Sequence, residues 1–173
     1  MRIRPVLALS TAATALLLAT PQSGAAATRP APCAQKSLTV RAHVSQDPRV
    51  LHLSVTNHGA RACTVDRIPT VTFGDLDGAA LPVPAGDSAP YRIGAGKAAY
   101  ASVRTIADPA DPEARRVTSV GVSADPSHFG RSFSARRLGA GDAVLVWEPV
   151  TTWWKPSAAA ADKALAKGAL QSA

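Results

Sequence analysis

Two histidines are the first residues of this sequence whose type and spacing could support chemistry. His43 and His52 occupy polar positions in two alternating segments that are joined by a short turn through Asp47 and Pro48. If these segments pair with their apolar faces together, the two imidazoles meet on the outer face. Such a pair could share a transition metal or respond to pH. Because no third ligand is evident, the alternative is a pair of polar positions on an exposed strand face.

A second candidate is a short acidic run. Asp75, Asp77 and Gly78, with Asp87 downstream, superficially resemble a calcium-binding loop. Such loops supply six to eight oxygen ligands and include a late bidentate carboxylate, which is missing here. Asp77 and Gly78 also form the dipeptide typical of a tight hairpin turn. We therefore predict a turn at this position and no metal site.

Nucleophilic catalysis has no recognisable sequence signature in this chain. The serines lie in no Gly-x-Ser-x-Gly motif, and Cys63 is expected to be oxidised. His58 and His128 lie in loop contexts, but neither has an evident carboxylate to orient it. We predict no catalytic residue and no cofactor. A secreted enzyme or enzyme inhibitor whose site is assembled from loops remains the alternative.

Binding chemistry is better represented, in a basic group and a tryptophan pair. Phe129 and Phe133 alternate with the densest group of basic residues, which consists of Arg115, Arg116, Arg131, Arg136 and Arg137. This group could bind an anionic polymer, or it could be a solvated strand face. Nucleic acid is not an expected partner outside a cell. Trp153 and Trp154 could form an exposed platform for a partner, or they could pack over an open end of the domain.

Two cysteines and the N-terminal residues indicate the compartment. Arg2 and Arg4 precede an uncharged, apolar stretch at residues 6–19, and alanines fill positions 25–27. This pattern predicts a signal peptide over residues 1–27, cleaved after Ala27. The apolar stretch is shorter than a membrane-spanning helix needs, and no lipobox precedes Cys33. We expect free secretion into an oxidising compartment, where Cys33 and Cys63 can form only one intramolecular disulfide.

The elements that would position these residues are short strands. Apolar and polar residues alternate at 38–44 and again at 51–56, a period that is typical of half-buried strands. Further strands are expected at 71–76, 98–106, 117–123 and 144–147, and the last is apolar on both faces, which indicates a central or well-covered position. Turn signals separate these segments, and no repeat is visible. The pattern predicts an all-β, antiparallel β-sandwich.

The predicted domain limits follow from the same pattern. Residues 28–32 form a proline-rich lead, and residues 33–156 form the β-sandwich domain. Residues 157–173 are rich in alanine and lysine, and Gly168 interrupts them. They lack a wide apolar face for docking, so we predict a mobile tail. We expect a monomer with no transmembrane segment.

Several of these residues together resemble the DUF4232 family. The resemblance spans roughly residues 33–123 and is carried by Cys33 and by the segments 53–59, 62–65, 68–69, 71–73, 75–78 and 94–98. The resemblance implies a secreted or lipid-anchored actinobacterial protein with an immunoglobulin-like sandwich and no established activity. Many members carry a further cysteine pair and a later tryptophan that segment 98–106 of this chain lacks.

These observations favour a secreted, non-catalytic module that binds or spaces at the cell surface. The net charge of +7 at pH 7 agrees with an anionic partner, although charge also serves solubility. The predicted partner is a protein or an anionic cell-wall polymer that contacts the arginine group or the tryptophan pair. A weak metal-binding protein that uses His43 and His52 is a further alternative.

Overall fold

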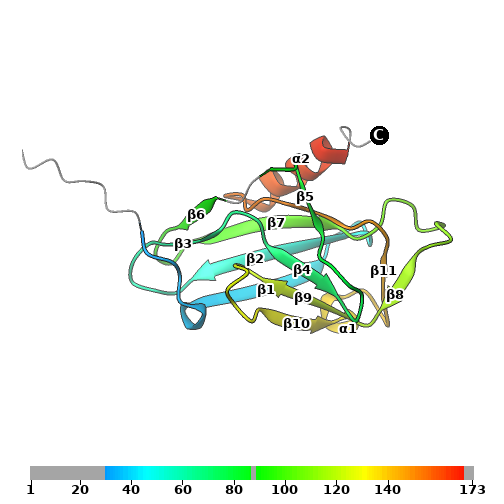
Figure 1. Cartoon of the computed structure of the whole chain (residues 1–173), viewed down its shortest axis with the longest axis horizontal. Coiled ribbons are helices and arrows are strands. Elements are labelled where there is room, and N and C mark those ends of the chain that lie inside the picture. The colour runs from blue at the N-terminus through cyan, green and yellow to red at the C-terminus, as the bar shows by residue number, and fades with distance from the viewer. Residues whose placement is uncertain (1–29, 87–88, 170–173) are drawn as a thin grey trace, which may run out of the picture.

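The computed structural model describes residues 30–86 and 89–169, which form mainly short strands (Figure 1). The predicted signal peptide and its cleavage site lie outside these residues. In chain order the elements are the 3-10 helix η1 (Gln35–Ser37), β1 (Leu38–Val44), β2 (Val50–Asn57), β3 (Cys63–Asp66), β4 (Thr70–Phe73), β5 (Leu81–Val83), β6 (Pro90–Ile93), β7 (Ala98–Arg104), β8 (Arg115–Val117), β9 (Ser119–Ser123), β10 (Arg131–Ser134), α1 (Ala135–Leu138), β11 (Val144–Val146), β12 (Val150–Thr152) and α2 (Ala158–Ala169).

The larger sheet begins with the hairpin that the alternating pattern predicts. β1 and β2 pair antiparallel, and His43 lies opposite His52, as expected. Along β2 the side chains of Leu51, Leu53 and Val55 are buried, while the residues between them are partly exposed. A period of two therefore sets both the register and the buried face of this hairpin.

Five strands make up this sheet, in the order β1-β2-β7-β12-β5. The prediction of an antiparallel arrangement holds for every pair except β12 and β5, which run parallel. The chain enters β5 from β4, which belongs to another sheet. Because no hairpin leads into β5, its direction is not constrained to oppose that of its neighbour.

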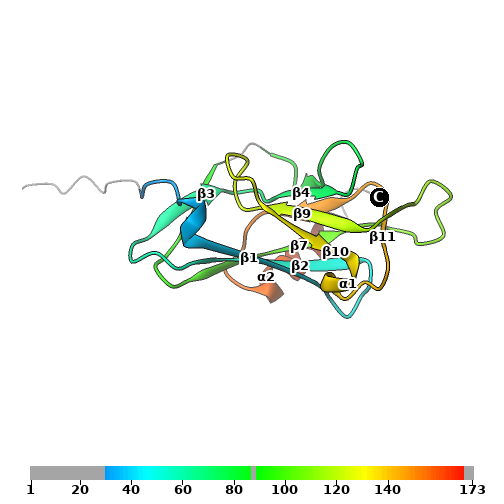
Figure 2. The same ribbon diagram turned by 90° about the horizontal axis from the view of Figure 1, so that it is seen from below.

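A three-stranded sheet, in the order β10-β9-β4, faces the larger one (Figure 2). Its buried side chains include Val71, Phe73, Val120, Val122 and Phe133. They belong to one continuous hydrophobic cluster with the inward side chains of β2 and β7. The molecule thus has two sheet layers around one core. Two further strand pairs, β11-β8 and β3-β6, lie at its ends (Figure 1).

One local prediction was wrong. Asp77 and Gly78 do not join a hairpin, because β4 pairs with β9 and β5 pairs with β12. β11 was predicted to be central or well covered, and it is covered without being central, since its one partner in the described part of the chain is β8. Val144 and Val146 are nevertheless buried, so the apolar run reflects packing against the core and not a position inside a large sheet.

The prediction that the C-terminal segment has no docking face was also wrong. α2 packs on the outer face of the larger sheet, with Ala161 and Leu165 buried (Figures 1 and 2). A narrow apolar stripe is sufficient because the sheet presents small, fully buried side chains there, those of Ser102 and Thr152. Ser157 caps the helix, since its hydroxyl oxygen accepts a hydrogen bond from the Ala160 N–H at 3.2 Å.

Gly168 provides a direct test of this packing. A Cβ atom at Gly168 would lie 2.8 Å from the Cβ of Val83, so any side chain must push α2 away from β5. We expect Gly168→Val to lower the free energy of unfolding by about 1–3 kcal/mol, the usual cost of overpacking. Ala166→Val, at an exposed position of the same helix, is the control in urea unfolding. Helix propensity alone favours the Gly168 variant over the control, so an equal or smaller loss would contradict close packing.

Neither α1 nor α2 is long and apolar enough to cross a membrane, and no other α-helix lies in the described part of the chain.

Candidate binding surface

The connection between β9 and β10, residues 124–130, is held by a dense set of hydrogen bonds; we call it the Phe129 loop. The Asp125 carboxylate accepts hydrogen bonds from the Asp66 N–H at 2.8 Å, the Ser127 N–H at 3.0 Å and the Ser127 hydroxyl at 2.6 Å. Burial alone would raise the pKa of Asp125, but these hydrogen bonds lower it below its ordinary value. The ionised carboxylate therefore organises the loop.

Further contacts fix the remainder of the Phe129 loop. The Ser123 hydroxyl donates to the carbonyl oxygen of Asp125 at 2.6 Å and is 3.2 Å from that of His128. Gly130 has a φ of 70°, and a Cβ atom there would lie 2.7 Å from the carbonyl oxygen of Val122. Only glycine fits this position without strain. The loop is thus restrained on both sides of Phe129.

The predicted disulfide is present, and the N-terminal segment that it anchors contacts the Phe129 loop. Cys33 is bonded to Cys63, and the Cys33 N–H donates to the carbonyl oxygen of Thr64 at 2.7 Å. The carbonyl oxygen of Cys33 lies 3.1 Å from His128 Nε2, and the Gln35 side-chain oxygen accepts from the Phe129 N–H at 3.1 Å. The N-terminal segment and the loop therefore support each other.

Phe129 itself is fully exposed at the tip of this loop. Among the described residues, the other large hydrophobic side chain with high exposure is Leu81. Exposed aromatic side chains on well-ordered backbone are typical of the residues that dominate binding at interfaces. An ordered loop that presents an uncovered phenylalanine is therefore a candidate contact point.

A groove of about 520 Å³ runs beside this side chain, and we call it the Phe129 groove. Two of the side chains that line it, those of Lys36 and Arg131, are positively charged, and both are exposed. Neither forms an ion pair with another described residue. None of the described residues that line the groove has a carboxylate; they are Gln35, Lys36, Leu38, Thr39, Val40, Ser123, Ala124, His128, Phe129, Gly130 and Arg131. Its chemistry is apolar and cationic, which suits an anionic partner.

The structure divides the predicted arginine group between different elements. Arg131 borders the Phe129 groove and lies over the Phe133 ring, 5.3 Å from its centroid. Arg136 and Arg137 follow in α1, where Arg136 pairs with Asp142 at 2.8 Å. The other two members, Arg115 and Arg116, are exposed on β8 in a separate strand pair.

The tryptophan pair does not form one exposed platform. Trp154 is buried in the hydrophobic core. Trp153 is partly exposed, and its ring is contacted by two cations, Arg67 at 4.9 Å and Lys155 at 5.7 Å. The neighbouring residues point in different directions because side chains alternate along extended backbone. Trp154 therefore serves to pack the core, and the ring of Trp153 is already in contact with Arg67 and Lys155.

The two histidines meet as predicted, but no metal site accompanies them. The rings of His43 and His52 are edge to face, with centroids 5.5 Å apart. Within residues 30–86 and 89–169, no three potential metal ligands lie close enough together to hold an ion. Asp75 and Asp77, the candidates for a calcium loop, are therefore not part of such a group either. Asp87 lies outside the described residues. His52 Nε2 instead contacts Asp162 of α2 at 2.8 Å.

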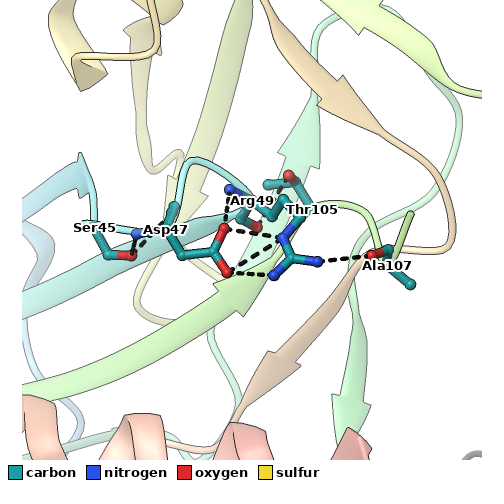
Figure 3. A network of polar contacts seen from close by, with 5 residues as sticks. All are labelled: Ser45, Asp47, Arg49, Thr105 and Ala107. Carbon is teal, nitrogen blue, oxygen red and sulfur yellow. Dashed lines mark hydrogen bonds and ion pairs between the residues drawn. The ribbon is translucent and has the colours of Figure 1, made fainter. Parts of the chain in front are cut away.

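This contact belongs to a second groove, of about 890 Å³, between the β1–β2 hairpin and α2. Its acidic side chains are paired. Asp47 forms a 2.7 Å ion pair with Arg49, which also donates to the carbonyl oxygen of Ala107 at 3.1 Å (Figure 3). The hydrogen bonds from Arg49 lower the pKa of Asp47. The network braces the hairpin turn and leaves no free carboxylate in the groove for a ligand.

The buried Ser102 meets Asp162 and His52 next to this groove, but the order of the three residues does not suit nucleophilic catalysis. The Ser102 hydroxyl donates to Asp162 Oδ1 at 2.6 Å, and His52 Nε2 contacts the same oxygen. A catalytic triad places the histidine between the hydroxyl and the carboxylate, so that it can take the proton. Here the carboxylate lies in the middle, and its role is to fasten α2 to the sheet. His58 is exposed in the loop after β2.

Sequence reasoning identified Phe129 and Arg131 but missed Lys36, Gln35 and Leu38, which complete the groove. These residues are about ninety positions from the loop in the sequence. The cysteine pair was the available signal, because it fixes the start of the domain beside β3. It could not indicate that the Phe129 loop would pack on the same segment.

Comparison with known protein families gave a match over most of the chain. The family model "Domain of unknown function (DUF4232)" matches residues 33–154. The match extends beyond the span of roughly 33–123 that the motifs suggested, and it covers β1 to β12 but not α2. Searches among curated proteins and among solved structures gave no match. The chain therefore belongs to the DUF4232 family.

Proposed function

We propose that this protein is a secreted, non-catalytic module of immunoglobulin-like architecture that binds an anionic partner at a cell surface through the Phe129 groove. Two facing sheets around one core and a single disulfide support the architecture. The disulfide and the basic, then apolar, N-terminal pattern support secretion, in line with the actinobacterial origin that the resemblance implies.

The observation that carries the proposal is the state of Phe129. A large apolar side chain is fully exposed on a loop that is restrained by Asp125, Ser123 and Gly130. Lys36 and Arg131, two cations that have no ion-pair partner among the described residues, line the groove beside it. A restrained loop loses little conformational entropy on association, so burial of the ring contributes directly to affinity. The cations select a negatively charged partner and guide its approach.

Binding of the mature protein (residues 28–173) to immobilised cell-wall polymer and to poly-L-glutamate, across a salt series, tests this proposal. We expect binding that weakens as salt rises. Phe129→Ala should weaken it roughly thirtyfold, because an aromatic interface anchor contributes about 2 kcal/mol. Arg131→Glu should weaken it at least as much, since it replaces attraction with repulsion.

The matched control is Arg116→Glu, which makes the same charge change at an exposed position on β8. We expect it to reduce binding far less than Arg131→Glu. Equal effects of the two arginine variants would mean that net charge alone drives binding, and would reject the groove as the site. Absence of binding to both polymers at low salt would reject the proposed function.

A further inference from the structure

β1 is an edge strand of the larger sheet, and half of its backbone groups face away from that sheet. The Ser37 carbonyl oxygen accepts from the His58 N–H, and the Ser45 N–H donates to the Val50 carbonyl oxygen, both at 2.8 Å. Residues that are an even number of positions from Ser37 therefore direct their backbone groups toward β2. Those between them, beginning with Leu38 and Val40, direct theirs outward.

These outward groups lie beside the Phe129 groove. Leu38, Thr39 and Val40 form one wall of the groove, and the Phe129 loop and Arg131 form the opposite wall. The Leu38 N–H donates to the carbonyl oxygen of Gln35, but no described residue hydrogen-bonds the outward carbonyl oxygen of Leu38 or the outward N–H and C=O groups of Val40. Figures 1 and 2 show β1 and β10 along the same side of the molecule. An open strand edge is a template for another extended chain.

The charges on this side decide which chain can occupy the edge. β1 exposes Arg41, and the groove adds Lys36 and Arg131. A second copy of this protein, paired edge to edge, would bring like charges together, which opposes association. A strand with acidic side chains would instead place carboxylates near these cations. The edge therefore favours an acidic partner over self-association.

We infer that the anionic partner is an extended, acidic segment of a polypeptide that adds to β1 as a further strand. This inference rests on the proposed function and specifies its ligand. The main chain of the segment hydrogen-bonds the outward carbonyl oxygen of Leu38 and the outward N–H and C=O groups of Val40. Its acidic side chains pair with Lys36 and Arg131, and an apolar side chain packs on Phe129. Backbone pairing supplies affinity, and the flanking side chains supply selectivity.

Val40→Pro is the variant that isolates the backbone contribution. Proline removes the outward N–H of Val40 and fills the space beside it, while the ladder between β1 and β2 keeps its hydrogen bonds. Val40→Ala is the matched control, since it shortens the same side chain but retains the N–H. Thermal unfolding of both variants establishes that each is folded before binding is compared.

The probe is a short, blocked peptide of alternating valine and glutamate, measured by fluorescence anisotropy with the mature protein. We expect Val40→Pro to weaken its binding roughly tenfold relative to Val40→Ala, the effect of losing about one hydrogen bond. The same peptide with alternate amides N-methylated should lose a similar factor against the unaltered protein. This second readout does not depend on how Val40→Pro folds.

Polyphosphate, which has no peptide backbone, distinguishes failure of this inference from failure of the proposed function. Strand addition predicts that the peptide is sensitive to both Val40→Pro and N-methylation, and that polyphosphate binding is insensitive to Val40→Pro. If peptide and polyphosphate both respond to Arg131→Glu but neither peptide change matters, strand addition is wrong and a groove for anionic polymers remains. If neither probe binds at low salt, both proposals are rejected.

Discussion

Replacement of Trp154 by alanine is expected to lower the free energy of unfolding by about 3–5 kcal/mol, the usual cost of deleting a buried tryptophan. The Trp154 side chain is 2% exposed and is part of the core cluster. Its backbone N–H donates to the carbonyl oxygen of Arg67 at 2.9 Å, so the backbone at this position cannot easily move to fill the space that the ring leaves. Urea unfolding, followed by far-UV circular dichroism, measures the loss.

The adjacent tryptophan provides the matched control. Trp153→Ala removes a partly exposed ring and its contacts with Arg67 and Lys155, so we expect a smaller loss of about 1 kcal/mol. Trp154→Phe should cost less than Trp154→Ala, because it keeps an aromatic ring and removes an indole N–H that is buried without a hydrogen-bond partner. Equal losses for Trp153→Ala and Trp154→Ala would contradict the asymmetry of the pair.

Removal of the disulfide, with Cys33 and Cys63 both replaced by alanine, is expected to cost about 3–4 kcal/mol through the greater entropy of the unfolded chain. The two residues are 30 positions apart in the sequence. The variant should also bind the partner more weakly. The disulfide anchors the segment that includes Cys33 and Gln35, and this segment forms hydrogen bonds with His128 and Phe129 of the Phe129 loop. Urea unfolding measures the first effect, and anisotropy with the acidic peptide measures the second.

Reduction of the unaltered protein by dithiothreitol is the control for this variant. Reduction should reproduce both losses in the unaltered protein and leave the double variant unchanged. An unchanged unfolding midpoint after complete reduction, confirmed by thiol titration, would show that the bond contributes little to stability. A loss of stability without any loss of binding would show that the groove does not depend on Cys33.

The sequence was most informative where one local pattern determines the structure. Alternation at residues 38–44 and 51–56 is sufficient to place β1 against β2 and His43 opposite His52, because one buried face permits one register. A lone cysteine pair likewise leaves a single intramolecular disulfide. These features depend on periodicity and counting, which are visible in a single chain.

Other features depend on surfaces that form only after folding. α2 packs on the sheet with little apolar area, because Ser102 and Thr152 of the sheet are small and Gly168 fits against Val83. The sequence of residues 158–169 alone does not reveal which side chains the sheet presents to the helix. The parallel pairing of β5 with β12 results from a crossing between sheets. The groove needs Lys36 and Arg131 on the same side, and no local signal relates residues so distant in the chain.

The restraint on the Phe129 loop has a consequence for the kinetics of recognition. Asp125, Ser123 and Gly130 hold the loop in one conformation before any partner arrives. The entropy cost of ordering the loop is therefore incurred when the protein folds and not when it binds. The free protein thus already holds the aromatic ring in the geometry that a complex would use. Encounter should then proceed as a single bimolecular step without a slow rearrangement of the loop, and differences in affinity among partners should appear mainly in their dissociation rates.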